Sequence, residues 1–230
     1  MKHTWLLDAG HGGMSPKGAY TTAPAKMHIF PDGLTIYEGV NNRKIVDKLR
    51  RLLFLSNIDH HLIPDPWRDT PLKERVALAN RLHEEKKNCI YLSIHSDAMP
   101  EGAHGKGSGF SVYTSVGHTQ SDAIAEIFCT TYLRRLSQFR FRRNLTDGDL
   151  DHEENFYVLK NTTCPALLVE NLFFDNRKEA EFLLSEAGQS QIAMTLFEAI
   201  VEIQGSGVSG EGSVPRALDS SLRDSSLRSE

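Results

Sequence analysis

Three short apolar runs along the chain each lead to a side chain that can bind a metal ion or transfer a proton. The runs begin at positions 4, 89 and 165, and they lead to His11, His95 and Glu170. Near-continuous apolar runs of this length are typical of strands in a parallel sheet that is covered on both faces. Because ligand sites of open α/β sheets lie outside the carboxyl ends of the strands, we expect the three side chains to meet in one site.

The segments between these runs show helical spacing of apolar residues. Helices are expected after Glu38, from Thr70-Pro71 to about Lys87, from Ser121 to Leu136, from Ala180 to Leu184 and from Gln191 to Ile203. Thr70 has the form of an N-cap with proline at the first helical position, and Asn176 has the form of an N-cap followed three residues later by glutamate. Further strands are expected at 58–63, 108–114 and 156–159. The pattern predicts a single α/β domain, with a mostly parallel, twisted sheet of about six strands and helices on both faces.

The composition is that of one globular domain, except near the C-terminal end, where it is typical of a disordered segment. The 230 residues are 40% hydrophobic and carry a formal net charge of −4, which gives no general attraction to nucleic acid. The three cysteines are odd in number and widely spaced, so buried free thiols are expected rather than a disulfide framework. From Gly205 the chain is rich in glycine and serine. We therefore expect a folded domain over residues 1–204 and a disordered tail over 205–230.

Two other groups of polar residues have ordinary explanations. His60 and His61 are adjacent in a predicted strand, so they point to opposite faces and cannot both serve one site. Five arginines fall between positions 134 and 143, with two phenylalanines among them. Such a cluster could bind an anionic polymer, but a helix end followed by a solvated turn is the commoner explanation.

Two histidines, one carboxylate and a position left for water make up the open coordination of a catalytic zinc ion. His11 and His95 supply the histidines, while Glu38 and Glu170 are the available carboxylates. Spacing alone does not decide which glutamate would bind the metal. Glu38 could instead complete a capping box with Thr35, and the histidines could be satisfied by backbone hydrogen bonds in tight turns.

Several short motifs in one order extend this pattern to a known family. They are His11-Gly12-Gly13 after Leu-Asp-Ala-Gly, Glu38 with Asn42, Leu72 with Arg75, Ala79 and Asn80, Ser93-Ile94-His95-Ser96-Asp97-Ala98, and Val169-Glu170 followed by Phe173 and Asn176. Together they resemble the zinc-dependent N-acetylmuramoyl-L-alanine amidases, which include bacterial cell-separation amidases and phage endolysins. The resemblance covers nearly all of residues 3–203.

The resemblance implies roles for four residues. His11, Glu38 and His95 would bind one zinc ion per chain, and Glu170 would be the catalytic acid and base. The implied reaction is hydrolysis of the amide bond between N-acetylmuramic acid and L-alanine in peptidoglycan. Asp8, three positions before His11, could orient a ligand or cap the turn.

Two positions depart from the family pattern. Leu172 stands where the family usually has glycine, and Asp175 where it has serine. These departures concern the shape of the substrate groove more than the reaction. No long insertion between Leu136 and Phe156 could form the blocking helix of the regulated cell-division members, so we expect an open site.

Other interpretations predict other products. A zinc carboxypeptidase or aminopeptidase would cut within cell-wall peptides, and a non-catalytic peptidoglycan-binding module would cut nothing. We expect a monomer that acts on the cell wall, in the periplasm or outside the cell, with no nucleic-acid partner and no integral membrane segment. Residues 1–3 do not resemble a signal peptide, so we expect either release in the manner of a lysin or an exported protein that has been trimmed.

Overall fold

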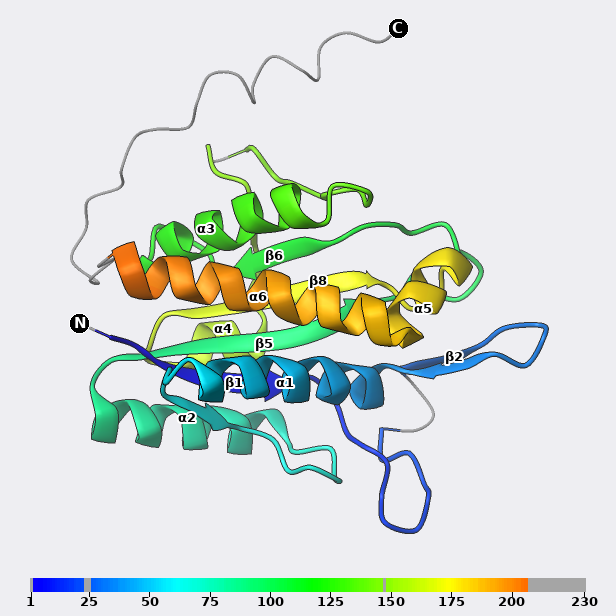
Figure 1. Cartoon of the computed structure of the whole chain (residues 1–230), viewed down its shortest axis with the longest axis horizontal. Coiled ribbons are helices and arrows are strands. Elements are labelled where there is room, and N and C mark those ends of the chain that lie inside the picture. Colours follow the sequence, from blue (N-terminus) through cyan, green and yellow to red (C-terminus); the bar gives the residue numbers. More distant parts are fainter. Residues whose placement is uncertain (1, 23–25, 147, 207–230) are drawn as a thin grey trace, which may run out of the picture.

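A six-stranded sheet forms the centre of the molecule, with the strand order β4-β1-β5-β8-β6-β7 (Figure 1). The computed structural model describes residues 2–22, 26–146 and 148–206. Strands β4, β1, β5 and β8 run parallel, and β6 is antiparallel to β8 and parallel to β7. The strands are β1 (Thr4–Ala9), β4 (His60–Leu62), β5 (Cys89–Asp97), β6 (Ser111–Thr114), β7 (His152–Glu153) and β8 (Ala166–Phe173), and a separate hairpin pairs β2 (Met27–Ile29) with β3 (Thr35–Tyr37).

Helices cover both faces of this sheet, which confirms the predicted α/β architecture (Figure 1). The helices are α1 (Glu38–Leu55), α2 (Leu72–Lys86), α3 (Gln120–Arg135), α4 (Tyr157–Asn161), α5 (Arg177–Leu184) and α6 (Glu186–Ser206). α1 and α3 each pack against α6 on one face, while α2 and α4 pack together on the other. The expected tail over 205–230 lies outside the described residues, apart from the two residues that end α6.

Alternation along the strands separates two apolar clusters, one on each face. In β1, Leu7 belongs to the cluster under α1, α3 and α6, whereas Leu6 belongs to the smaller cluster under α2 and α4. Because successive side chains of a strand point to opposite faces, Asp8 lies on the same face as Leu6. The smaller cluster also holds Tyr91 of β5 and Leu168 of β8. Asp8, His95 and Glu170 follow these apolar residues at alternate positions of the same strands. They therefore lie on the α2/α4 face, nearer the carboxyl ends of the strands than the apolar cluster does.

Residues 156–159 do not form the predicted strand. Val158 and Leu159 belong instead to the short helix α4, and both are buried in the α2/α4 cluster. Neighbouring residues of a strand would point to opposite faces, whereas on a helix both can pack toward one surface. Short apolar runs do not distinguish these cases by periodicity alone, which is why the prediction was wrong.

The helix ends show which predicted caps form. α2 begins at Leu72, after a non-helical Pro71, and the Thr70 hydroxyl accepts a hydrogen bond from the Asp65 amide at 2.9 Å instead of capping the helix. The predicted cap at Thr70 is therefore wrong. Asn176 does cap α5, because its side chain accepts from the Glu179 amide.

The two ends of the described domain lie together, beside the amino-terminal end of β1. The His3 amide donates to Gln204 Oε1 at 2.8 Å, and Gln204 Nε2 donates to the His3 carbonyl at 2.7 Å. All three cysteines are free and buried, as expected. In the described part of the chain, no helix has both the length and the apolar character that a bilayer crossing requires.

Candidate active site

Three of the four predicted site residues form a tight cluster at the carboxyl end of β1 and β5. One nitrogen each of His11 and His95 and one oxygen of Glu38 lie within 4.8 Å of one another. His11 Nε2 is 3.2 Å from Glu38 Oε2, and His95 Nδ1 is 3.1 Å from Glu38 Oε1. His11 lies in the turn after β1, Glu38 is the first residue of α1, and His95 lies near the end of β5. The fold therefore brings together residues that are distant in the sequence; Glu38 and His95, for example, are 57 positions apart.

Glu38 does not complete a capping box. Tyr37 is the N-cap of α1 and makes no side-chain cap bond, while the Thr35 hydroxyl donates to the Gly33 carbonyl at 3.2 Å. Glu38 Oε1 instead accepts from Asn42 Nδ2 and from the Ser96 amide, both at 3.3 Å. Burial by itself opposes ionisation, but the two histidines, whose ring nitrogens lie 3.2 and 3.1 Å from its oxygens and whose positive charge favours the carboxylate, lower the pKa of Glu38 overall. The site thus keeps a buried carboxylate ionised.

The turn that carries His11 restricts which residues can stand at positions 10 and 11. His11 adopts a left-handed φ of 63°. A Cβ atom at Gly10 would lie 2.2 Å from the His95 ring, so the imidazole occupies the space that any side chain at position 10 would need. Glycine before His11 therefore allows the two rings to meet edge to face, with centroids 4.9 Å apart.

Asp8 acts on the His11 turn through Arg75 rather than by contact with a histidine. Asp8 is 1% exposed and forms a buried ion pair with Arg75, and it also accepts from Tyr91 and Ser93. Arg75 Nη2 donates to the His11 carbonyl at 2.9 Å. Arg43 Nη1 donates to the same carbonyl, also at 2.9 Å. Two guanidinium groups thus hold the turn that carries His11.

We expect Arg75→Met to lower the free energy of unfolding by about 3–5 kcal/mol, because it leaves the Asp8 charge buried without its partner. Urea denaturation monitored by circular dichroism measures this change. The double variant Asp8→Asn with Arg75→Met removes both charges and should lose less stability than the sum of the single changes. A single Arg75→Met variant with unchanged stability would contradict the structural role of this pair.

Glu170 lies beside the cluster, paired in register with His95 across β5 and β8. Burial raises the pKa of Glu170 to about 8; the His95 charge opposes this rise, and the carboxylates of Glu38 and Asp97 add to it. Its Oε2 atom is buried and has no hydrogen-bond partner among the described residues. The carboxyl group is therefore next to the cluster without being part of it, in surroundings that favour uptake of a proton.

Leu172, two residues after Glu170, lies in a bulge of β8. His95 pairs with Glu170 and Asp97 pairs with Phe173, so β8 contains one residue more than β5 over this interval. Leu172 is fully buried and has a left-handed φ of 65°, a conformation that glycine adopts more easily. The position at which the sequence departs from the family glycine is thus one where the backbone suits glycine.

We expect Leu172→Ala to lower the free energy of unfolding by about 2–5 kcal/mol, since it truncates a buried leucine. Leu172→Gly should be no less stable than Leu172→Ala, because glycine avoids about 1–2 kcal/mol of left-handed strain. In an ordinary strand the order would be reversed. Urea denaturation of both variants compares them, and a clearly less stable glycine variant would contradict the strain at this position.

The donor set of the cluster fits a zinc ion. Two imidazoles and one carboxylate are zinc ligands, and catalytic sites use three protein ligands. Glu38 Oε2 is buried and makes no hydrogen bond to any described residue, although His11 Nε2 is near it. A buried carboxylate oxygen without a hydrogen bond is costly unless a further ligand binds it. A cation held by these three side chains would supply that partner.

The remaining candidates lie apart from the cluster. His60 Nδ1 contacts the Ile58 carbonyl at 2.8 Å on the edge strand β4, which agrees with a structural role. Arg134 and Arg135 pair with Glu198 of α6. Arg142 differs from the other arginines, because it is held beside β5, β6 and β8. Sequence reasoning missed this difference, since nothing in the spacing of the arginines distinguishes one of them.

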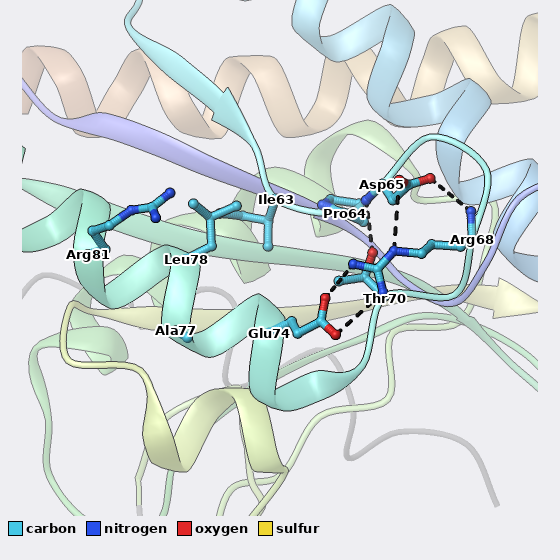
Figure 2. A pocket seen from close by; sticks show the side chains of 9 residues that line it. All are labelled: Ile63, Pro64, Asp65, Arg68, Thr70, Glu74, Ala77, Leu78 and Arg81. Carbon is cyan, nitrogen blue, oxygen red and sulfur yellow. Dashed lines mark hydrogen bonds and ion pairs between the residues drawn. The ribbon is translucent and has the colours of Figure 1, made fainter.

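A separate hollow of about 490 Å³ lies between α2 and the loop after β4 (Figure 2). None of the four candidate residues lines it; Figure 2 shows that Asp65, Arg68, Thr70 and Glu74 line it and interact with one another. The same loop reaches the His11 turn, because the Trp67 carbonyl accepts from the Gly13 amide at 3.0 Å. The loop therefore braces the candidate active site, and the hollow lies outside that site.

The fold and the cluster together define a class of protein. It has one α/β domain, a group of possible metal ligands at the carboxyl ends of parallel strands, and a half-buried carboxyl group beside them.

Comparison with known proteins identifies the family. A family model described as N-acetylmuramoyl-L-alanine amidase matches residues 6–202, and the chain belongs to this family. The endolysin of Bacillus phage SPP1 is 27% identical over 95% of this chain and 72% of its own length. The amidase CwlM of Bacillus licheniformis is 35% identical over 82% of this chain and 63% of its own length.

Solved structures show the same fold. An N-acetylmuramoyl-L-alanine amidase from Clostridium difficile 630 superposes with a TM-score of 0.68 at 24% identity, covering 90% of this chain and 98% of that one. Ami1 from Mycobacterium smegmatis gives a TM-score of 0.71 at 19% identity, covering 89% of this chain and 97% of that one.

Proposed function

We propose that this enzyme is a zinc-dependent amidase that cleaves the bond between N-acetylmuramic acid and L-alanine in peptidoglycan. His11, Glu38 and His95 would hold one zinc ion, and Glu170 would transfer the proton. The observation that carries the zinc assignment is the meeting of these three ligand atoms within 4.8 Å around a buried carboxylate oxygen that has no hydrogen bond. All four side chains come from one chain, which is consistent with a monomer.

Zinc in such a site makes water more acidic and polarises a carbonyl group. Ionised Glu170 accepts a proton from the attacking water as the water oxygen bonds to the scissile carbonyl carbon. Glu170 then gives this proton to the nitrogen of L-alanine as the C–N bond breaks, so the amine leaves neutral and the carboxylate is regenerated. A raised pKa suits a group that must both take up and release a proton near neutral pH.

Glu38 and Glu170 have opposite tasks because their surroundings differ. Glu38 faces two histidines, which keep it ionised, whereas desolvation of the half-buried Glu170, together with the nearby carboxylates of Glu38 and Asp97, raises its pKa. Two carboxyl groups whose pKa values are driven apart in this way are suited to separate roles in one reaction. The polypeptide around the cluster thus supports a ligand role for Glu38 and a proton-transfer role for Glu170.

Metal analysis of the purified protein, combined with mass spectrometry of digested peptidoglycan, tests the proposal. We expect about one zinc per chain and the release of stem peptides that begin with free L-alanine, with activity lost on chelation and restored by zinc. Cleavage only within the stem peptide would indicate a peptidase. Absence of zinc and of products after metal is added back would indicate a relative that binds the cell wall without cutting it.

A further inference from the structure

His95, Glu170 and Ser111 form a row across three neighbouring strands. His95 of β5 pairs with Glu170 of β8, and Glu170 pairs with Ser111 of β6. Figure 1 shows these strands side by side. Paired residues of adjacent strands project to the same face, so the three side chains lie in line on the α2/α4 face. The cluster with His95 is at one end of this row, and Ser111 is at the other.

Arg142 lies at the Ser111 end of the row, and three strands hold it there. Its Nη2 atom is 2.7 Å from Ser111 Oγ and 2.8 Å from Asp97 Oδ2. Its guanidinium carbon lies 4.6 Å from the centre of the Phe173 ring. The bulge at Leu172 brings Phe173 into register with Asp97 and so contributes to this contact. A side chain fixed by β5, β6 and β8 loses little further freedom when it binds a ligand.

Arg142 also retains donors for a ligand. A guanidinium group has five N–H donors, and both polar contacts of Arg142 use Nη2. The side chain is 22% exposed, so part of it is open to solvent. The neighbouring Arg143 is exposed and is not held in this way.

The direction of the reaction places the leaving peptide on this side. The scissile carbonyl must lie toward the His11–Glu38–His95 cluster, while the departing nitrogen must lie within reach of Glu170 to receive its proton. The row continues past Glu170 to Ser111 and Arg142. A peptide that extends from this nitrogen along the row therefore reaches Arg142.

The geometry points to Arg142 as a specificity residue that binds a carboxylate of the leaving stem peptide. This inference rests on the proposed amidase reaction. Guanidinium groups bind carboxylates through charge-assisted, paired hydrogen bonds. The residue after L-alanine in stem peptides is D-glutamate or its amide, D-isoglutamine. Arg142 would favour the form with the free carboxylate.

Two soluble substrates that differ only in this group test the inference. They are N-acetylmuramoyl-L-alanyl-D-glutamate and the corresponding D-isoglutamine compound, and kcat and KM are measured for the zinc-loaded protein. We expect the KM of the unmodified protein to be about tenfold lower for the acid than for the amide, the scale of a hydrogen bond to a charged group. Arg142→Gln should remove this preference and leave kcat nearly unchanged, as expected for a binding interaction.

Arg143→Gln is the matched control and should keep the preference. Arg142→Lys keeps the charge without the planar fork and should retain part of it. The ratio of the KM values for the two substrates is calculated for each variant separately. A general loss of affinity, caused by leaving Asp97 without its partner, affects both KM values and cancels in this ratio. Equal KM values for both substrates in the unmodified protein, or an undiminished preference in Arg142→Gln, would overturn the inference.

Binding to the Glu170→Gln protein gives a readout that does not depend on turnover. Calorimetric titration of both compounds into this variant, with and without Arg142→Gln, should show the same roughly tenfold preference and its loss. If the unmodified protein cleaves neither compound, the proposed reaction fails, and the titration still decides whether Arg142 binds the carboxylate. If both are cleaved equally well and bound equally well, only the assignment of Arg142 fails.

Discussion

Glu170→Gln is expected to keep its zinc and to lose at least about two orders of magnitude in kcat, the usual scale for loss of a general base. The amide has nearly the same shape but cannot accept the proton from water. Because burial already disfavours the charged form of Glu170, a neutral amide should not destabilise the fold. Steady-state kinetics on a soluble muropeptide and metal analysis of the same sample measure both quantities.

Glu186→Gln is a suitable control, since the Glu186 side chain is 83% exposed at the start of α6. It should retain both zinc and activity. If Glu170→Gln hydrolysed its substrate at the unmodified rate, Glu170 would not be the proton-transfer group. If it lost zinc as well, Glu170 would be a ligand, and its role and that of Glu38 would have to be exchanged.

The same assignment predicts an acid limb in the pH profile. Glu170 must be ionised to accept a proton, so kcat/KM should fall as pH falls through its pKa. That pKa is about 8 in the metal-free protein, and a bound cation would lower it, because positive charge favours the carboxylate. The limb should therefore lie below pH 8 and should be absent from the residual activity of Glu170→Gln.

His95→Ala is expected to abolish stoichiometric zinc binding and, with it, activity. The substitution removes one of three ligands and leaves Glu38 buried with only one histidine beside it. Loss of a ligand from a three-residue site removes the geometry that the metal requires. Metal analysis after dialysis against buffer that contains a weak chelator measures the zinc retained.

His118→Ala controls for the loss of a histidine as such, because the His118 side chain is 93% exposed and is not one of the cluster residues. It should retain its zinc. One zinc per chain in His95→Ala would show that the ligand set is different. A folded His95→Ala protein, verified by circular dichroism, is needed for the comparison. The cluster lies at the carboxyl ends of β1 and β5 rather than in the apolar core.

The elements that could be predicted from the sequence are those whose type is determined by one local pattern of apolar residues. The runs that lead to His11, His95 and Glu170 are strands or strand ends because their side chains fill both faces of a covered sheet. Parallel strands then bring their carboxyl ends together without any further information. The approximate position of the site followed from this rule alone.

What could not be predicted depends on distant partners. The ion pair of Asp8 with Arg75 joins residues 67 positions apart, and no local pattern records it. Val158 and Leu159 lie in the helix α4, where both neighbouring side chains pack into the α2/α4 cluster. Arg142 became distinguishable from four other arginines only when β5, β6 and β8 were seen to surround it.

The pairing of His3 with Gln204 has a consequence for protein engineering. Both ends of the domain meet beside the amino-terminal end of β1. The candidate active site lies at the other end of the strands, where β1 and β5 finish. A carrier protein or targeting module fused before His3 or after Ser206 would thus be attached at the opposite end of β1 from the candidate active site. A short peptide could also join the two ends, with new termini opened in the exposed loop around Gly102, to give a circular permutant that keeps every strand intact.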